Sequence, residues 1–178
     1  DKIANIIGVA VFRELGPLVS AIVLTGFAGA AIAAELGTMV VGEEIEALEA
    51  HALNPIRFLV VPRVVATIVS LIALTVIGDI AAVTFGGVMT VGFLGVPYGV
   101  YEANTLDQLV LNDFLTGLFK AAWFGLILSA IACHNGLRVT GGAAGVGRAT
   151  TDTVVQTIVT VIMADLLFTS IFYSLGLT

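Results

Sequence analysis

The chain has 178 residues, of which 58% are hydrophobic and only 11% charged, and its formal net charge is −6. A soluble domain carries about 25% charged residues, so the composition excludes an ordinary soluble enzyme and indicates an integral membrane protein. The acidic residues are scattered and there is no basic stripe, which argues against a nucleic-acid partner. Cys133 is the only cysteine, so an internal disulfide framework and a multi-cysteine metal site are excluded.

Four apolar segments are long enough to cross a bilayer, whose core of about 30 Å needs roughly 20 apolar residues in a helix. They predict spans at 15–34, 64–85, 114–132 and 154–175. The first is rich in Gly and Ala, which is typical of closely packed membrane helices. Residues 3–12 are apolar but too short to span, and the chain begins at Asp1 without a methionine. We therefore expect the natural N-terminus and one earlier span to be missing, so that the complete protein has five spans in one all-α transmembrane bundle.

An acidic segment lies between the first two spans. Apolar residues recur there at helical spacing, while glutamates occupy the other faces. This pattern predicts an amphipathic helix over 38–54 that ends before Pro55, because the residue preceding a proline disfavours helix. The apolar positions are Val41, Ile45, Leu48 and Ala52, and the acidic positions are Glu43, Glu44, Glu46 and Glu49. Such a helix cannot remain in lipid, and the pairing of a span with a docking segment suggests a transporter subunit that takes its energy from another protein.

Charged residues also occur within or near the later spans. Asp79 lies in the second, Lys120 near the start of the third and Asp165 in the last. Charges inside a membrane are costly and usually face an interior or a partner, so we expect Lys120 to pair with Asp165 or with Asp79. Glu35 is expected at the membrane boundary, near Arg57 or Arg63.

Glycines and polar residues divide the remaining chain into predicted connections. Gly86 to Pro97 is expected to end the second span, and 107–111 to form a surface turn or short helix. A glycine-rich loop is predicted at 136–147, followed by a helix start at 150–152, where hydroxyl and carboxylate side chains can cap free amide groups.

The arginines predict the orientation, since Lys and Arg are retained on the cytoplasmic side. Arg57 and Arg63 lie between spans one and two, and Arg138 and Arg148 between spans three and four, whereas 98–113 contains neither Lys nor Arg. The acidic helix and the glycine-rich loop are therefore expected in the cytoplasm and the C-terminus outside.

Several motifs in order resemble one known family. They are Arg-Glu-Leu-Gly-Pro at 13–17, Gly-Ala-Ala-Ile-Ala-Ala-Glu-Leu-Gly-Thr-Met at 29–39, Glu-Glu-Ile-Glu-Ala-Leu-Glu at 43–49, Asn-Pro at 54–55 through Pro-Arg at 62–63, and the glycine-rich run at 141–151. These residues resemble the MlaE/YrbE permeases, which are the membrane subunits of MCE-type ABC lipid transporters, and the resemblance covers essentially the whole chain.

The resemblance implies a homodimer of five-span permeases in the bacterial inner membrane. Each copy would dock on a cytoplasmic ABC ATPase, which holds the ATP and Mg²⁺, while this chain itself has no cofactor, metal or catalytic residue. A periplasmic ring of MCE-domain protein would cover the outer face, and the cargo would be phospholipid moved between the inner membrane and the outer envelope, which bears on lipid asymmetry.

The resemblance also implies roles for particular residues. The family's pair matching Arg13 and Glu14 lines its lipid cavity, and the family usually has an arginine where this chain has Phe27. The implied lipid-binding set is Arg13, Glu14, Leu15 and Phe27. The implied ATPase-coupling set, with Ile45 and Leu48 as anchors, is Glu43, Glu44, Ile45, Glu46, Leu48 and Glu49.

The residues by themselves leave other functions open. The acidic helix could lie on the bilayer as a simple connector, and Arg13 with Glu14 could form a local ion pair or anchor the span at the interface. An ion-gradient-driven transporter would use Asp79 and Asp165 as coupling carboxylates, and an intramembrane lipid enzyme or a structural subunit are further alternatives. The glycine-rich run is followed by Arg148-Ala149 rather than by the Lys and Ser or Thr of a phosphate-binding P-loop, so ATP hydrolysis is expected on a partner.

Overall fold

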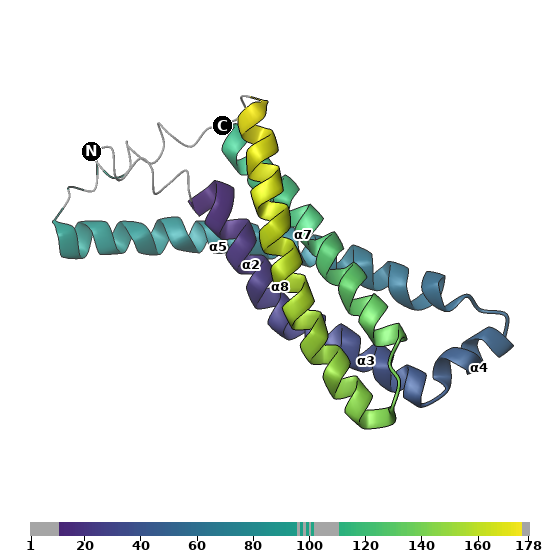
Figure 1. The fold of residues 1–178 in the computed structure, drawn as a ribbon. Helices are drawn as coiled ribbons and strands as arrows, with labels where there is room; N and C mark the ends of the chain where they lie inside the picture. Colours follow the sequence, from purple (N-terminus) through teal and green to yellow (C-terminus); the bar gives the residue numbers. More distant parts are fainter. Residues whose placement is uncertain (1–10, 96, 98, 100, 102–110, 176–178) are drawn as a thin grey trace.

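The computed structural model describes residues 11–95, 97, 99, 101 and 111–175, and all regular elements among them are helical (Figure 1). Four of these helices are long and apolar enough to cross a membrane: Arg13–Val41, Ile56–Phe93, Asn112–Leu137 and Gly142–Ser174. The described part of the chain therefore confirms the predicted polytopic all-α bundle with four spans. The short apolar segment before residue 11 and the predicted turn at 107–110 lie outside the described residues.

The first span is one continuous helix interrupted by two wider turns. A π-helical turn, Val11–Leu15, leads into α2 (Gly16–Leu24), a second, Thr25–Gly29, follows, and α3 (Ala30–Val41) completes the span. The predicted end at residue 34 is wrong, because the helix continues for seven more residues. The extension is stabilised by packing: Leu36 and Gly37 are buried, and a Cβ atom on Gly37 would lie only 2.8 Å from the side chain of Val139.

The acidic segment folds as a shorter helix than predicted. The chain reverses at Gly42-Glu43, where Glu43 has a φ of 58°, and α4 covers only Glu44–Ala50. Residues 38–41, predicted as the start of this helix, belong to α3, and Ala52, at a φ of 58°, lies beyond its end. The Asn54 side chain then accepts hydrogen bonds from the backbone N–H groups of Ile56 and Arg57 at 3.0 and 3.3 Å, which starts the next helix.

The second span is longer than predicted. A π-helical turn at Ile56–Val60 leads into α5 (Val61–Leu94), which passes through Gly86-Gly87 without a break and ends at Gly95, where φ is 66°. At 1.5 Å per residue, Ile56–Phe93 is about 57 Å long, well beyond a bilayer core. Its far end extends away from the other spans (Figure 1). Gly87 makes room for the ring of Tyr101, whose hydroxyl donates to the Val83 carbonyl at 2.8 Å.

The last two spans form a tight antiparallel pair, α7 (Leu111–Leu137) and α8 (Gly142–Ser174). The predicted loop at 136–147 is wrong, since only 138–141 lie between the helices, and the predicted helix start at 150–152 is eight residues late. Gly141 and Gly142 make the turn with φ values of 85° and 67°. Gly136 and Gly145 of this run allow close packing: a Cβ atom on Gly136 would lie 3.0 Å from the Ala33 carbonyl oxygen.

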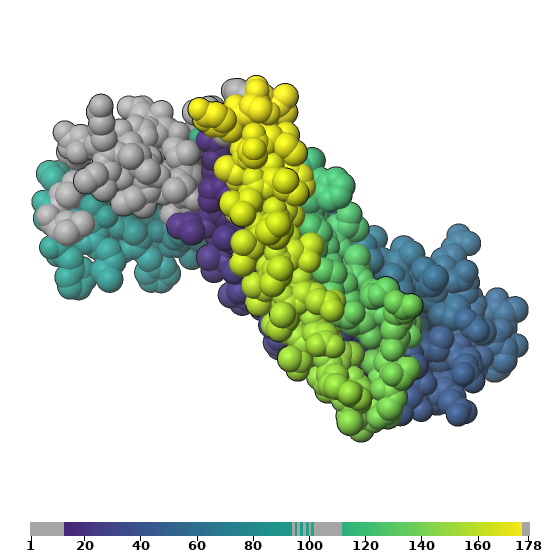
Figure 2. Space-filling model, in the orientation of Figure 1, coloured from purple at the N-terminus to yellow at the C-terminus, as the bar shows by residue number. Residues whose placement is uncertain are grey.

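The core lies where α7 meets the three other spans. One buried cluster joins Ala21, Leu71, Phe124 and Val161, one from each span. α7 and α5 approach so closely that a Cβ atom on Gly125 would stand 2.9 Å from the Cα of Ile68. Figure 2 shows α8 and α7 side by side along the visible face, with the α3–α4 region at one end. α4 and the α7–α8 turn thus share one end of the bundle, as the predicted topology requires.

Candidate functional site

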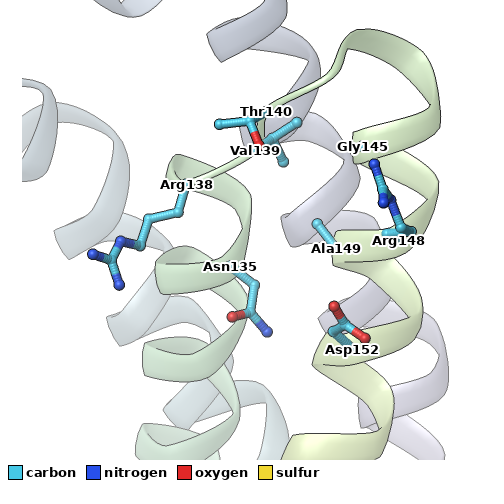
Figure 3. Close-up of a pocket in the computed structure, with 8 residues that line it drawn as sticks. All are labelled: Asn135, Arg138, Val139, Thr140, Gly145, Arg148, Ala149 and Asp152. Carbon is cyan, nitrogen blue, oxygen red and sulfur yellow. The ribbon is translucent and has the colours of Figure 1, made fainter.

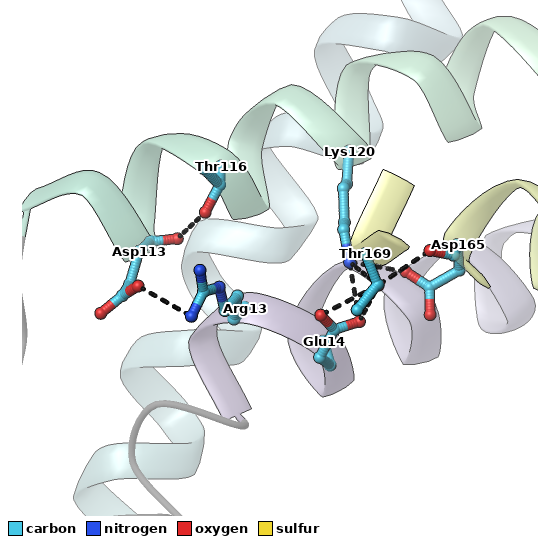
Figure 4. A network of polar contacts seen from close by, with 7 residues as sticks. All are labelled: Arg13, Glu14, Asp113, Thr116, Lys120, Asp165 and Thr169. Carbon is cyan, nitrogen blue, oxygen red and sulfur yellow. Dashed lines mark hydrogen bonds and ion pairs between the residues drawn. The ribbon is translucent and has the colours of Figure 1, made fainter. Parts of the chain in front are cut away.

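A fully buried lysine forms the centre of a charge cluster between three of the spans. Lys120 of α7 is 0% exposed, and its Nζ donates to Glu14 Oε2 at 2.7 Å, Asp165 Oδ1 at 3.0 Å and Thr169 Oγ1 at 2.8 Å (Figure 4). An ammonium group has three donors, so all of them are used. A charge removed from water in this way is stable only when it is paired and hydrogen-bonded.

The helices position these groups by their periodicity. Asp165 and Thr169 lie four residues apart on α8, so that they occupy one face. The Thr169 hydroxyl lies 2.8 Å from the Asp165 backbone carbonyl and 3.2 Å from each Glu14 oxygen. Glu14 comes from the π-helical turn that precedes α2 and is 29% exposed, the most accessible of the three charged groups. The cluster therefore holds two carboxylates and one ammonium, with a formal charge of −1.

A second ion pair lies beside the cluster. Arg13 Nη1 is 3.5 Å from Asp113 Oδ1, and both side chains are largely buried (Figure 4). Arg13 and Glu14, although adjacent in sequence, thus contact different partners on α7. Together the two contacts fix the beginning of the first span against the beginning of α7.

The structure decides between the pairings that the sequence left open. Lys120 pairs with Asp165, as predicted, and Asp79 is not part of the cluster. Asp79 is buried on α5, and its Oδ1 has no hydrogen-bond partner among the described residues. Glu35 pairs with Arg63 at 3.1 Å, which was one of the two partners expected. Sequence reasoning missed Thr169, although its position one helical turn after Asp165 was an available signal.

The other lipid-binding residues implied by the resemblance lie on the outside of the bundle. Leu15 is 50% exposed and Phe27 80%, so neither joins the cluster of Glu14 and Lys120. They instead belong to one row at four-residue spacing along the first span. The exposed apolar side chains of this row, named here the outer stripe, are Leu15, Val19, Val23 and Phe27.

The acidic helix α4 has two different faces. Glu44, Glu46 and Glu49 of α4 are exposed, as is Glu43 in the turn before it. Ile45 and Leu48, the expected anchors in an ATPase groove, pack instead against the subunit's own cluster of Leu36, Leu59 and Cys133. They therefore attach α4 to its own subunit, while both side chains stay partly exposed and line pockets beside α4.

The apolar spans, the buried charge cluster and the exposed acidic helix define a multi-pass membrane protein. The sequence matches the family model described as Permease MlaE over residues 1–171. A probable ABC transporter permease protein of Rickettsia typhi is 37% identical over 173 residues, which cover 97% of this chain and 67% of that protein. The chloroplastic protein TRIGALACTOSYLDIACYLGLYCEROL 1 of Arabidopsis thaliana is 34% identical over 172 residues, or 97% of this chain and 49% of that one.

A probable ABC transporter permease protein of Synechocystis is 33% identical over 163 residues, covering 92% of this chain and 62% of that protein. The chain belongs to the MlaE permease family, which confirms the resemblance seen in its motifs. It is an ABC transporter permease subunit, and it spans 49–67% of the length of these relatives.

Proposed function

We propose that this chain is the membrane-spanning subunit of an ATP-driven phospholipid transporter. A second copy completes the translocation cavity, and a separate ABC ATPase supplies the energy. The observation that carries the proposal is the charge cluster around Lys120, placed at the beginning of the outer stripe. An anionic headgroup needs cations within the membrane, and a pair of acyl chains needs an apolar surface that starts beside them.

The headgroup would be held where Arg13 and Glu14 begin the first span. A phosphate makes short, charge-assisted hydrogen bonds to ammonium and guanidinium groups. Glu14 is the most exposed carboxylate of the cluster, so it is the acceptor that a phosphate can replace at Lys120 with the least rearrangement. Arg13 lies next to it in sequence and supplies a second cation.

The acyl chains would lie along the outer stripe. From Leu15 to Phe27 the stripe spans about 18 Å at 1.5 Å per residue, and its members are between half and four fifths exposed. Two copies facing each other through this row would enclose an apolar cavity with a charged end. The proposal therefore includes a homodimer. It also includes a periplasmic MCE-domain ring and a location in the inner membrane.

The ATPase would bind the exposed glutamates of α4. Charge reversal at Glu46 and Glu49 is expected to abolish recovery of the ATPase in mild detergent, whereas the matched variant with aspartate at both positions retains it. Because Ile45 and Leu48 are unchanged, α4 stays attached to its own subunit. Undiminished recovery after charge reversal would refute docking through this face.

The lipid site is tested by placing a carboxylate on the outer stripe. Phe27→Glu is expected to remove co-purified phospholipid and ATP-dependent lipid movement in proteoliposomes. Val159→Glu is the matched control, since Val159 is also a large, exposed apolar residue within a span, and a membrane-facing charge costs a similar amount at both positions. Equal loss in both variants would refute a specific role for the stripe.

The ion-gradient alternative would use Asp79 and Asp165 as coupling carboxylates. Asp165 is ion-paired with Lys120 at 3.0 Å, whereas Asp79 Oδ1 has no hydrogen-bond partner among the described residues. Transport that persists without any ATPase and stops with an uncoupler would nevertheless favour that alternative over ours.

A further inference from the structure

A polar cavity lies at the opposite end of the bundle from the Lys120 cluster. It has a volume of about 320 Å³ and is formed between the end of α7, the turn and the beginning of α8 (Figure 3). Asn135 of α7 and Asp152 of α8 point into it from facing helices. The Arg148 side chain extends along α8 toward the turn. Arg138 extends to the other side of its helix, where its Nη1 lies 3.3 Å from His134 Nε2.

The two charges of α8 at this cavity do not pair with each other. Arg148 and Asp152 are four residues apart, a spacing that would allow an ion pair, yet neither side chain makes an ion pair or a hydrogen bond with any other described residue. The Arg148 guanidinium lies instead over the turn, with Nη2 3.5 Å from where a Cβ atom of Gly141 would be. The cavity thus presents a separate cation and anion along one helix.

Hydrogen bonds and close backbone packing join the two walls of the cavity. Asn135 donates from Nδ2 to Thr153 Oγ1 at 3.1 Å and to Gln156 Oε1 at 3.0 Å. Gly145 packs directly on the Thr140 backbone, with no space for a Cβ atom between them. These contacts join α7 and α8 at this end, and the Arg148 and Asp152 side chains are exposed beside them.

The cavity is expected at the level of the bilayer where lipid headgroups lie. Asn135 lies three residues beyond the predicted third span, and Asp152 two residues before the last, which is about 3–5 Å along a helix. The polar layer of a bilayer extends roughly 5–8 Å beyond its core on each side. Basic pockets between membrane helices at the cytoplasmic side bind the phosphates of lipid headgroups, and Arg148 supplies the cation in this cavity.

We propose that this cavity binds the headgroup of a zwitterionic phospholipid in the cytoplasmic leaflet, with the phosphate on Arg148 and the amine on Asp152. The site is separate from the cavity of the proposed function and does not depend on Lys120. An anionic lipid would engage Arg148 but would meet Asp152 as a like charge. The separated charges therefore favour a headgroup that carries both signs.

The test is native mass spectrometry of the full chain in detergent with dihexanoyl phosphatidylethanolamine, dihexanoyl phosphatidylglycerol or inorganic phosphate. Losing a charged hydrogen-bond partner weakens binding roughly tenfold or more. Arg148→Gln is expected to weaken both lipids, and Arg148→Lys to restore part of the affinity. Asp152→Asn is expected to weaken only the ethanolamine lipid.

A control variant separates this site from its surroundings. Arg57→Gln removes an exposed arginine at the same end of the bundle and is expected to retain ethanolamine-lipid binding. An equal loss in Arg57→Gln would mean general surface charge and would overturn the proposal. Competition by inorganic phosphate at similar concentration would identify an anion site instead, and loss of the ATPase with unchanged lipid binding in Arg148→Gln would identify a protein contact.

Discussion

Substituting Lys120 by methionine removes the central charge of the cluster while keeping a side chain of similar length. Glu14 and Asp165 each place an oxygen within 3.0 Å of the same lysine nitrogen, so their carboxylates would face each other at about 6 Å or less. At an effective dielectric constant of about 20, two charges at this separation repel by roughly 3 kcal/mol. Removing one partner of a buried pair typically costs about 3–5 kcal/mol, and we expect Lys120→Met to lower the free energy of unfolding by this amount.

A second substitution tests whether the loss comes from uncompensated charge. Lys120→Met combined with Asp165→Asn leaves only Glu14, which is 29% exposed and can turn toward water. The double variant is therefore expected to be more stable than Lys120→Met alone, although it contains one more substitution. This reversal follows from charge compensation and would not follow from lost packing.

Thermal unfolding in detergent measures both variants, with the fluorescence of Trp123 as the signal. Trp123 is the only tryptophan of the chain and lies one turn from Lys120 on α7. For a domain of this size each kcal/mol shifts the midpoint by about 2–4 °C, so Lys120→Met is expected to lower it by about 6–20 °C. If the double variant unfolds at a lower temperature than Lys120→Met alone, the charge-cluster reasoning is wrong.

Three further predictions follow from the packing and the topology. Gly125→Ala is expected to cost about 1–3 kcal/mol of stability by forcing α5 and α7 apart, whereas Gly147→Ala, which meets no atom within 4 Å, is expected to be neutral or to gain up to about 1 kcal/mol; midpoints in detergent compare them. Glu35→Gln is expected to cost less than about 1 kcal/mol in denaturant titrations, because the Glu35 side chain is 63% exposed and such ion pairs contribute little. A cysteine at Glu46, in a variant with Cys133→Ala, is expected to react with a membrane-impermeant maleimide only from the cytoplasmic side, and labelling from the periplasm in intact cells would contradict the orientation.

The existence of the spans was predictable because it depends only on the length of apolar runs. The pairing of Lys120 was partly predictable for a related reason: a charge inside a membrane requires a partner, and few candidates were available. The choice of Asp165 over Asp79, and the participation of Glu14, depend on which faces of four helices meet. That information arises only from packing, so sequence spacing did not contain it.

Most of the wrongly predicted helix boundaries were placed at glycines. In soluble proteins glycine marks turns, and the runs at 86–87 and 136–147 were interpreted in that sense. In this bundle Gly87 makes room for Tyr101 and Gly136 for α3, because small residues allow close approach of membrane helices. Only Gly95, Gly141 and Gly142 have positive φ among the described glycines, and these are the ones at helix ends.

The packing of α4 changes how energy from an ATPase would reach the lipid site. The sequence predicted that Ile45 and Leu48 contact a partner. In the structure they pack against a cluster that contains Leu36, and Leu36 lies on the same continuous helix as Glu14. That helix, Arg13–Val41, is about 43 Å long and contains the π-helical turn Thr25–Gly29 between its two ends. On the proposed function, a displacement of α4 would be transmitted along this helix to Glu14, the carboxylate that holds Lys120. On that proposal the exposed glutamates of α4 would contact the ATPase, and Ile45 and Leu48 would pass the movement to the first span.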